Sequence, residues 1–177
     1  MLEIEVKYFD QNMPQLSKIS KGDWIDVRAC RVEVNGKKKP WLAKEEFNRH
    51  DQYHEKKITA QEEVIAYQAG DELLIHLGFA MKLPEGYEAH VLPRSSTFSK
   101  YGLILVNSMG IIDNTYQGEE DEWLFSCYAL KAGVLSRYAR VGQFRIFANM
   151  PDIAFSEVKF LKAPSRGGYG STDYEMQ

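Results

Sequence analysis

Short apolar runs, most of about four to eight residues, recur along the chain between glycine, proline, aspartate and asparagine residues. At the N-terminus, MLEIEVKYFD alternates apolar and charged residues, which is typical of a strand and not of a signal peptide. Further strands are expected at 64–67, 73–77, 89–92, 103–106, 123–128 and 144–147. Regular spacing of such short strands predicts an all-β protein, a β-barrel or jelly roll.

Residues 35–63 interrupt this pattern, since they are dense in charge and poor in β-branched side chains. We interpret them as an insertion between two early strands, part of which forms a short solvated helix with Pro40 in its first turn. His50 and His54 have the spacing of a zinc-binding pair, but without a third ligand nearby the favoured interpretation is two solvated side chains. The charged run is read as a solvated surface, with a protein partner as the alternative.

Composition narrows the class of protein. A chain of 177 residues with 44% hydrophobic content fits one domain, 1–177, and no apolar run approaches the roughly 20 residues that span a bilayer. The two cysteines, Cys30 and Cys127, have no paired spacing, which favours a reducing cytoplasm. A net charge of −3 argues against nucleic-acid binding, so a polyanionic ligand would need local arginines or a divalent cation.

Candidate chemistry is concentrated in PRSSTFSKYGLILVNSMGIIDNTYQG, residues 93–118. Its Arg-Ser-Ser loop suits phosphate oxygens, because a guanidinium binds them bidentately and hydroxyls add donors. Its second half reads as a hairpin that carries Asp113 and Tyr116 three residues apart. The pair suits a nucleotide attacked by an activated water. The plainer alternatives are a solvated arginine turn, a turn-forming aspartate and a cross-strand aromatic. The phosphate site must be built without a Walker loop or a GxGxxG motif, as neither occurs.

Five segments resemble, in order, the five motifs of the trimeric dUTPase family, most closely its bacterial and phage members. They are GDWIDVRAC, PRSS, NSMGIIDNTYQG, RVGQFRIF and SRGGYGST. The resemblance covers nearly the whole chain apart from 35–63. It implies a distorted jelly-roll barrel, a homotrimer with shared active sites, and hydrolysis of dUTP to dUMP and pyrophosphate. That reaction limits uracil incorporation into DNA and supplies dUMP for thymidylate synthesis.

The resemblance also implies roles for residues of the third motif. Asp113 would be the general base for the water that attacks the α-phosphorus. Tyr116 would pack on the deoxyribose and leave no room for a 2′-hydroxyl. The hairpin backbone at 107–112, with Asn107, Gly110 and Ile112, would read uracil by hydrogen bonds that cytosine cannot reproduce.

Motifs one, two and four are expected to hold the phosphates and the metal. The phosphate-binding residues would be Arg94, Ser95 and Ser96, the last standing where the family has glycine. Asp26 would face a Mg²⁺–triphosphate through water, so no dedicated protein cage is expected for the Mg²⁺. Arg140 and Gln143 match the fourth motif, in which the glutamine helps to hold the site from a neighbouring subunit.

The glycine-rich tail, 163–177, is expected to be a flexible lid. The resemblance implies that Tyr169 stacks over uracil and that Arg166 approaches the γ-phosphate, with Gly170 and Ser171 in the same motif. Arg166 precedes the aromatic residue by three positions, whereas five is usual in the family. Trp123 is an alternative aromatic cover, although sheet packing is the favoured interpretation.

Two other functions compete with dUTP hydrolysis. A dCTP deaminase would share the fold and the Arg-Ser-Ser stretch, but it would need a glutamate at the base-handling position and a different hairpin. A nucleotide-gated regulatory protein would use the pocket as a switch and 35–63 as its partner surface. Deleting 35–63 separates regulation from hydrolysis, since only partner capture should be lost.

Overall fold

The computed structural model describes residues 3–18, 20–43 and 62–165. Strands dominate this part of the chain, and the described helix, α2, is a short one at Thr97–Tyr101. The strands are β1 (Glu5–Tyr8), β2 (Ile25–Arg28), β3 (Arg31–Val34), β4 (Lys37–Lys39), β5 (Leu42–Ala43), β6 (Glu63–Tyr67), β7 (Glu72–His76), β8 (Phe79–Lys82), β9 (Tyr87–Pro93), β10 (Leu103–Leu105), β11 (Gly110–Ile112), β12 (Leu124–Ala129), β13 (Gly133–Ser136) and β14 (Arg140–Ala148). The prediction of an all-β protein is therefore confirmed.

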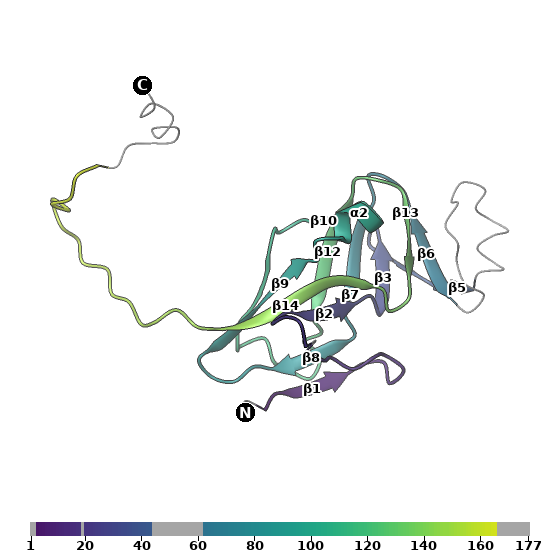
Figure 1. The fold of residues 1–177 in the computed structure, drawn as a ribbon, viewed down its shortest axis with the longest axis horizontal. Coiled ribbons are helices and arrows are strands. Elements are labelled where there is room, and N and C mark those ends of the chain that lie inside the picture. Colours follow the sequence, from purple (N-terminus) through teal and green to yellow (C-terminus); the bar gives the residue numbers. More distant parts are fainter. Residues whose placement is uncertain (1–2, 19, 44–61, 166–177) are drawn as a thin grey trace, which may run out of the picture.

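The described strands form antiparallel sheets whose order mixes distant parts of the chain (Figure 1). The largest sheet has the order β10-β12-β7-β3-β4, and a second has the order β11-β9-β14-β2. Smaller sheets pair β1 with β8 and arrange β13-β6-β5. Each of the runs expected from the sequence to be a strand lies in one of these elements, because alternating or continuous apolar residues must be covered by a neighbouring sheet.

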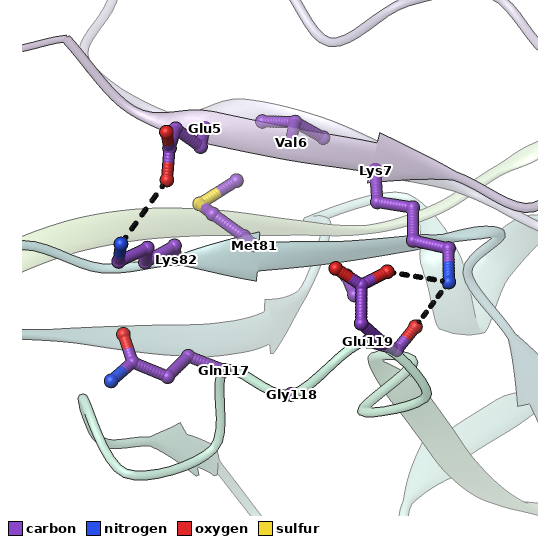
Figure 2. Close-up of a pocket in the computed structure, with 9 residues that line it drawn as sticks. Glu5, Val6, Lys7, Met81, Lys82, Gln117, Gly118 and Glu119 are labelled. Atoms are coloured by element: carbon purple, nitrogen blue, oxygen red, sulfur yellow. Dashed lines mark hydrogen bonds and ion pairs between the residues drawn. The ribbon is translucent and has the colours of Figure 1, made fainter.

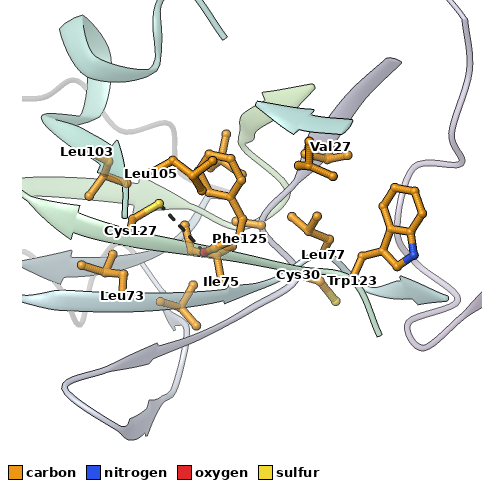
Figure 3. Packing of buried hydrophobic residues seen from close by; sticks show 14 of the residues in the cluster. Val27, Cys30, Leu73, Ile75, Leu77, Leu103, Leu105, Trp123, Phe125 and Cys127 are labelled. Atoms are coloured by element: carbon orange, nitrogen blue, oxygen red, sulfur yellow. Dashed lines mark hydrogen bonds between the residues drawn. The ribbon is translucent and has the colours of Figure 1, made fainter. Parts of the chain in front are cut away.

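The hydrophobic core lies between the two larger sheets (Figure 3). Leu73, Ile75 and Phe125 come from the first sheet, and Val91 and Phe144 come from the second, all almost fully buried. Packing two apolar faces in this way is the usual solution for antiparallel sheets with one wet side.

Trp123 belongs to this core and does not cover a ligand. It is 0% exposed, and its ring packs 5.1 Å from that of Phe79 and 5.2 Å from that of Phe144. The alternative of Trp123 as an aromatic lid is therefore wrong, because a fully enclosed indole cannot reach a nucleotide.

The hairpin expected at 107–118 is also wrong, since the strand in it, β11, does not pair with the strand that follows Asp113. β10 pairs with β12 in one sheet, whereas β11 pairs with β9 in the other. The connection between them crosses from sheet to sheet through Ser108, which has a positive φ of 61°. Each short strand thus lies at the edge of a different sheet, beside a longer strand.

A helix starting at Pro40 is likewise contradicted. Asn35 and Gly36, with φ of 50° and 72°, form a tight turn between β3 and β4, and Pro40 lies between β4 and β5. Asn-Gly favours such a two-residue hairpin because both positions need positive φ. The rest of the predicted insertion, with His50 and His54, falls within 44–61, outside the described residues.

After β14 the chain leaves the body as an extended segment, 149–165, which we call the arm (Figure 1). Its apolar side chains are largely exposed, including Phe155 at 95% and Phe160 at 78%. Among the described residues, no helix is long and apolar enough to cross a membrane.

Candidate active site

The loop after β9 is a tight turn that aims Arg94. The backbone N–H of Arg94 donates to Thr97 Oγ1 at 2.8 Å, and the N–H of Thr97 donates to the Arg94 carbonyl at 2.9 Å. The Thr97 hydroxyl in turn donates to the Val141 carbonyl at 2.8 Å, which ties the turn to β14. Hydrogen bonds within the turn and to β14 therefore fix its backbone, so the Arg94 side chain projects from a rigid position.

Ser95 and Ser96 complete this turn with free hydroxyls. Neither hydroxyl makes a hydrogen bond within the described part of the chain, so both are available to an oxyanion. Ser96, which replaces the glycine of the family motif, has φ −98° and ψ 0°. Because this φ is negative, an L-residue is tolerated and the turn does not require glycine.

Arg94 opens onto a cavity of about 260 Å³ that we call the arginine cavity. It is lined by Gly22, Trp24, Asp26, Arg94, Ser95, Arg140 and Gln143. Asp26 Oδ1 lies 2.7 Å from Arg94 Nε, and its Oδ2 accepts from Arg140 Nη1 at 3.0 Å. The structure thus brings together the residues that the sequence assigned to motifs one, two and four, except Ser96, which is not part of the lining.

The arginine cavity carries more positive than negative charge. One carboxylate, Asp26, faces two guanidiniums, and Arg28 lies close enough to be influenced by both. Burial, followed by repulsion from Arg140, lowers the pKa of Arg28 from its ordinary value. An excess of arginines held in fixed directions is suited to a polyphosphate, whose oxygens they bind bidentately.

Asn107, Gly110, Ile112, Asp113 and Tyr116 line a second cavity, of about 390 Å³, which we call the loop cavity. Ile111, Thr115, Glu122 and Leu124 complete its lining. Its floor is β11 and its wall is the loop that leads into β12. Backbone groups of an edge strand, such as β11, are free on one side to pair with a ligand.

The Asp113 carboxylate forms the turn that follows β11. Its Oδ1 accepts from the backbone N–H of Thr115 at 2.8 Å and from the Thr115 hydroxyl. These hydrogen bonds, the hydroxyl first, lower the pKa of Asp113. The side chain is exposed and ionised at neutral pH, and its Oδ2 makes no hydrogen bond to any described residue. An ionised, accessible carboxylate meets the first requirement of a general base.

Tyr116 is held by hydrogen bonds from its backbone and from its hydroxyl. Its backbone N–H donates to the Asp113 carbonyl at 3.2 Å, and its hydroxyl donates to the Glu122 carbonyl at 3.1 Å. Burial is the first cause of the raised pKa of its hydroxyl, with Asp121 and Glu122 adding to it. The hydroxyl therefore stays protonated and continues to act as a donor.

The loop that follows Tyr116 is fastened to the N-terminal strand beside a further cavity of about 320 Å³ (Figure 2). Lys7 Nζ lies 2.6 Å from the Glu119 carbonyl and 2.9 Å from the Glu119 carboxylate. Figure 2 shows these contacts on one side of the cavity and the Glu5–Lys82 ion pair on the other. Exposed pairs of this kind contribute little energy each, but they orient the loop that carries Tyr116.

Sequence reasoning missed three residues of these cavities. Trp24 stands next to the strand that carries Asp26, Thr115 bonds Asp113, and Glu122 bonds Tyr116. Thr115 could have been found, because threonine two residues after aspartate is a common turn pattern. Arg166, Tyr169, Gly170 and Ser171 lie outside the described residues. Within the described ranges, no three His, Cys, Asp or Glu side chains gather in a way that would hold a metal ion.

Asp113 and Arg94 lie far apart within one chain. Ile112 pairs with Ala89, so Asp113 lies beyond that point near the start of β9, whereas Arg94 follows its end. Along β9, the position beside Asp113 and the position of Arg94 are six residues apart. At about 3.4 Å per residue, this is a distance of roughly 20 Å.

Comparison with known proteins identifies the family of the chain. The dUTPase family model matches residues 57–173. The SPbeta prophage-derived deoxyuridine 5′-triphosphate nucleotidohydrolase YosS of Bacillus subtilis (strain 168) is 39% identical over 171 residues, which cover 97% of this chain and 98% of the relative.

Solved structures of low sequence identity share the fold. A Staphylococcus bacteriophage 80alpha dUTPase mutant with dUpNHpp has a TM-score of 0.63 at 15% identity, covering 97% of this chain and 99% of that one. A mutant dUTPase from phage phi11 of S. aureus, described for its coordination of a structural Mg(II) ion, has a TM-score of 0.61 at 12% identity, covering 92% and 100%. On the family match and the prophage relative, the chain belongs to the dUTPase family.

Proposed function

We propose that the loop cavity and the arginine cavity are the two halves of the active site of this dUTP diphosphatase. As a dUTPase, the protein hydrolyses dUTP to dUMP and pyrophosphate. The observation that carries the assignment of residues is the pairing of an ionised carboxylate beside an edge strand with an arginine-rich cavity. The first suits a nucleoside and a water, and the second suits a triphosphate.

In the loop cavity, Asp113 acts as the general base. Its lowered pKa keeps it ionised, and the Thr115 hydrogen bonds hold it in one direction. A water that it deprotonates attacks the α-phosphorus, the bond to the bridging oxygen breaks, and pyrophosphate leaves. Backbone groups of Asn107, Gly110 and Ile112 read the uracil edge, and Tyr116 packs on the deoxyribose.

In the arginine cavity, Arg94 and Arg140 bind phosphate oxygens, with Ser95 adding a hydroxyl donor and Ser96 adding another from the same turn, outside the lining. Gln143 donates to the Pro93 carbonyl at 3.3 Å, so it supports the strand end from which Arg94 projects. Before substrate binds, Asp26 keeps the two guanidiniums oriented and neutralises part of their charge. This pre-organisation lowers the cost of ordering long side chains on binding.

The roughly 20 Å between Asp113 and Arg94 supports sites shared between subunits. A general base must lie within about 3 Å of the proton it removes, so Asp113 cannot serve a triphosphate held by Arg94 of the same chain. A homotrimer with one site at each interface satisfies this requirement, because a closed ring brings unlike parts of identical chains together.

The arm gives independent support for association with copies of the same chain. Ile153, Phe155, Phe160 and Leu161 are between 57% and 95% exposed in the isolated chain. So many large exposed apolar side chains in one short segment are rare on a monomer and mark an interaction site. An extended chain with open backbone groups can dock on an edge of a neighbouring sheet.

Mg²⁺ use is part of the proposal, and the described residues fit a hydrated ion. Asp26 is the carboxylate of the arginine cavity, and each of its oxygens already contacts an arginine. Because a carboxylate has about four acceptor positions, Asp26 can still accept from a metal-bound water. Bound to the phosphates, the ion would offset their negative charge. The proposed location is the cytoplasm, since Cys30 and Cys127 are free thiols.

The decisive measurement is pyrophosphate release from dUTP, dCTP, dTTP and UTP with Mg²⁺, for the wild type and for Asp113→Asn. We expect release from dUTP alone, reduced about 10²- to 10⁴-fold in the variant, which is the usual effect of losing a general base. Binding of a non-hydrolysable dUTP analogue to the variant should be retained. A variant that keeps the wild-type rate would remove Asp113 from the mechanism.

A further inference from the structure

Glu122 is the one charged residue that is buried within the described part of the chain, at 7% exposure. Its Oε1 accepts from the backbone N–H of Gly78 at 2.9 Å. Its Oε2 accepts from His76 Nδ1 at 2.8 Å and from the Arg31 guanidinium. A carboxylate only accepts, so His76 carries a proton on Nδ1. Three donors from β3, β7 and the β7–β8 turn therefore hold this side chain in place.

The backbone next to this side chain is fixed as well. The N–H of Trp123 donates to the Phe79 carbonyl at 2.9 Å, and the Trp123 ring is enclosed by the core. The Glu122 carbonyl, which lies between the anchored side chain and Trp123, thus has little freedom to move. It accepts the hydrogen bond from the Tyr116 hydroxyl.

Tyr116 depends on this anchor because its own packing is incomplete. The residue is 38% exposed, so surrounding side chains do not enclose its ring. An aromatic ring excludes a 2′-hydroxyl only if it cannot move away from the sugar. A hydroxyl tethered to a fixed carbonyl provides that resistance.

We infer that Glu122 is a positioning residue that sets sugar selectivity by fixing the carbonyl that tethers the Tyr116 ring. The inference rests on the proposed function, in which Tyr116 faces the deoxyribose. The contacts of the Glu122 side chain to His76 and Arg31 then serve the Tyr116 ring indirectly, through the Glu122 carbonyl. Because the β7–β8 region is rigid, these contacts keep the Tyr116 ring in one position in the loop cavity.

The test is kcat/KM for dUTP and for UTP in four variants. Tyr116→Phe removes the tether, and Glu122→Gln removes the charge that Arg31 and His76 hold. The double variant combines them. Glu85→Gln is the matched control, because Glu85 is an exposed glutamate that makes no hydrogen bond or ion pair to a described residue. Each test variant should lower the dUTP/UTP ratio about threefold to tenfold, the usual effect of one hydrogen bond. The control should keep the wild-type ratio.

The double variant distinguishes positioning from simple support of the fold. If both residues act through one hydrogen bond, the double variant should lose no more selectivity than the single ones. Equal loss of kcat/KM on both substrates in Glu122→Gln, or full additivity, would overturn the inference. Should that variant not fold, an unchanged ratio in Tyr116→Phe would overturn it instead. A wild type that cleaves UTP as fast as dUTP would contradict the proposed function itself.

Discussion

The two oxygens of the Asp113 carboxylate have different roles, one in the turn and one in the proposed reaction. Through Oδ1 it closes the turn after β11, and through Oδ2 it remains free to meet a water. The turn hydrogen bonds stabilise the charged form, so they lower the pKa of the same group that we propose as the base. Thr115 therefore controls both the direction and the protonation of Asp113.

Replacing Thr115 by alanine should shift the acid side of the pH–kcat/KM profile to higher pH. The hydroxyl stabilises ionised Asp113, and without it the carboxyl takes up its proton at a higher pH. The rate should fall first in mildly acidic solution and stay close to wild type near neutrality. Kinetics across an acid-to-neutral pH series measure this shift.

Thr115→Ser is the matched control for that experiment. It retains the hydroxyl and the backbone N–H, so its acid limb should coincide with that of the wild type. If Thr115→Ala and Thr115→Ser behave alike, the hydroxyl does not tune Asp113.

Individual residue types predicted much of the candidate site. Asp26, Arg94, Asp113 and Gln143 lie in the cavities because each belongs to a short motif whose neighbours also face the same cavity. Glu122 escaped sequence reasoning, since nothing around it in GEEDEW distinguishes a buried glutamate from exposed ones. Its burial depends on Arg31, which is 91 positions away along the chain.

Among the strands and turns, the two-residue connection between β7 and β8 makes the strongest demand on its sequence. Gly78 has φ of 79°, and a Cβ there would lie 2.6 Å from Met13 Sδ and 2.7 Å from Cys30 Cβ. The N–H of Gly78 also donates a hydrogen bond to the Glu122 carboxylate. A side chain at this position would therefore be strained and would clash.

Gly78→Ala should destabilise the protein more than Gly36→Ala does. Both positions have positive φ, so each substitution costs about 1 kcal/mol in backbone strain. Gly36 has open space around it, whereas overpacking at Gly78 adds about 1 to 3 kcal/mol. Urea unfolding of the two variants measures the difference. Equal losses would mean that Met13 and Cys30 move aside freely.

Strand pairing was harder to predict than strand position. The turn residues of 107–118 favoured a hairpin there, yet β11 pairs with β9, and its chain neighbours β10 and β12 belong to another sheet. At 35–43 the error was the opposite one. The density of charge favoured a solvated helix, whereas the structure has a hairpin that turns at Asn35 and Gly36. Lysines on an edge strand such as β4 need no apolar pattern, since both of their faces are wet.

In the proposed homotrimer, the two cavities meet between neighbouring chains. If each site takes Asp113 from one chain and Arg94 from another, the variants Asp113→Asn and Arg94→Ala should complement each other. In randomly mixed oligomers, about a quarter of the sites would draw both intact residues from different chains. Co-expression of the two inactive variants should therefore restore about a quarter of the wild-type activity.

Each variant expressed alone supplies the baseline for this complementation. An inactive mixture of chains that demonstrably co-assemble would indicate that both halves of a site come from the same chain. The 20 Å estimate would then require a large movement of the loop cavity on binding.

The arm should be needed for assembly. Replacing Phe155 and Phe160 by serine should convert the oligomer to monomers, because each ring contributes about 2 to 3 kcal/mol when fully buried. Light scattering during gel filtration measures the mass. A matched pair of changes on the same segment, Ser156→Ala with Lys159→Gln, should leave the mass unchanged. An oligomer that survives the loss of both rings would place its interface elsewhere.

The strands, the motifs and most residues of the candidate site can be predicted from the sequence, because side-chain alternation and turn chemistry depend on a few neighbouring positions. Pairing and burial depend instead on residues brought together from far along the chain. Arg140 meets Asp26 across 114 positions, and Glu122 meets His76 across 46. For the same reason, only the folded chain reveals that Asp113 and Arg94 stand at opposite ends of β9. That separation is a property of strand register, which no local pattern contains.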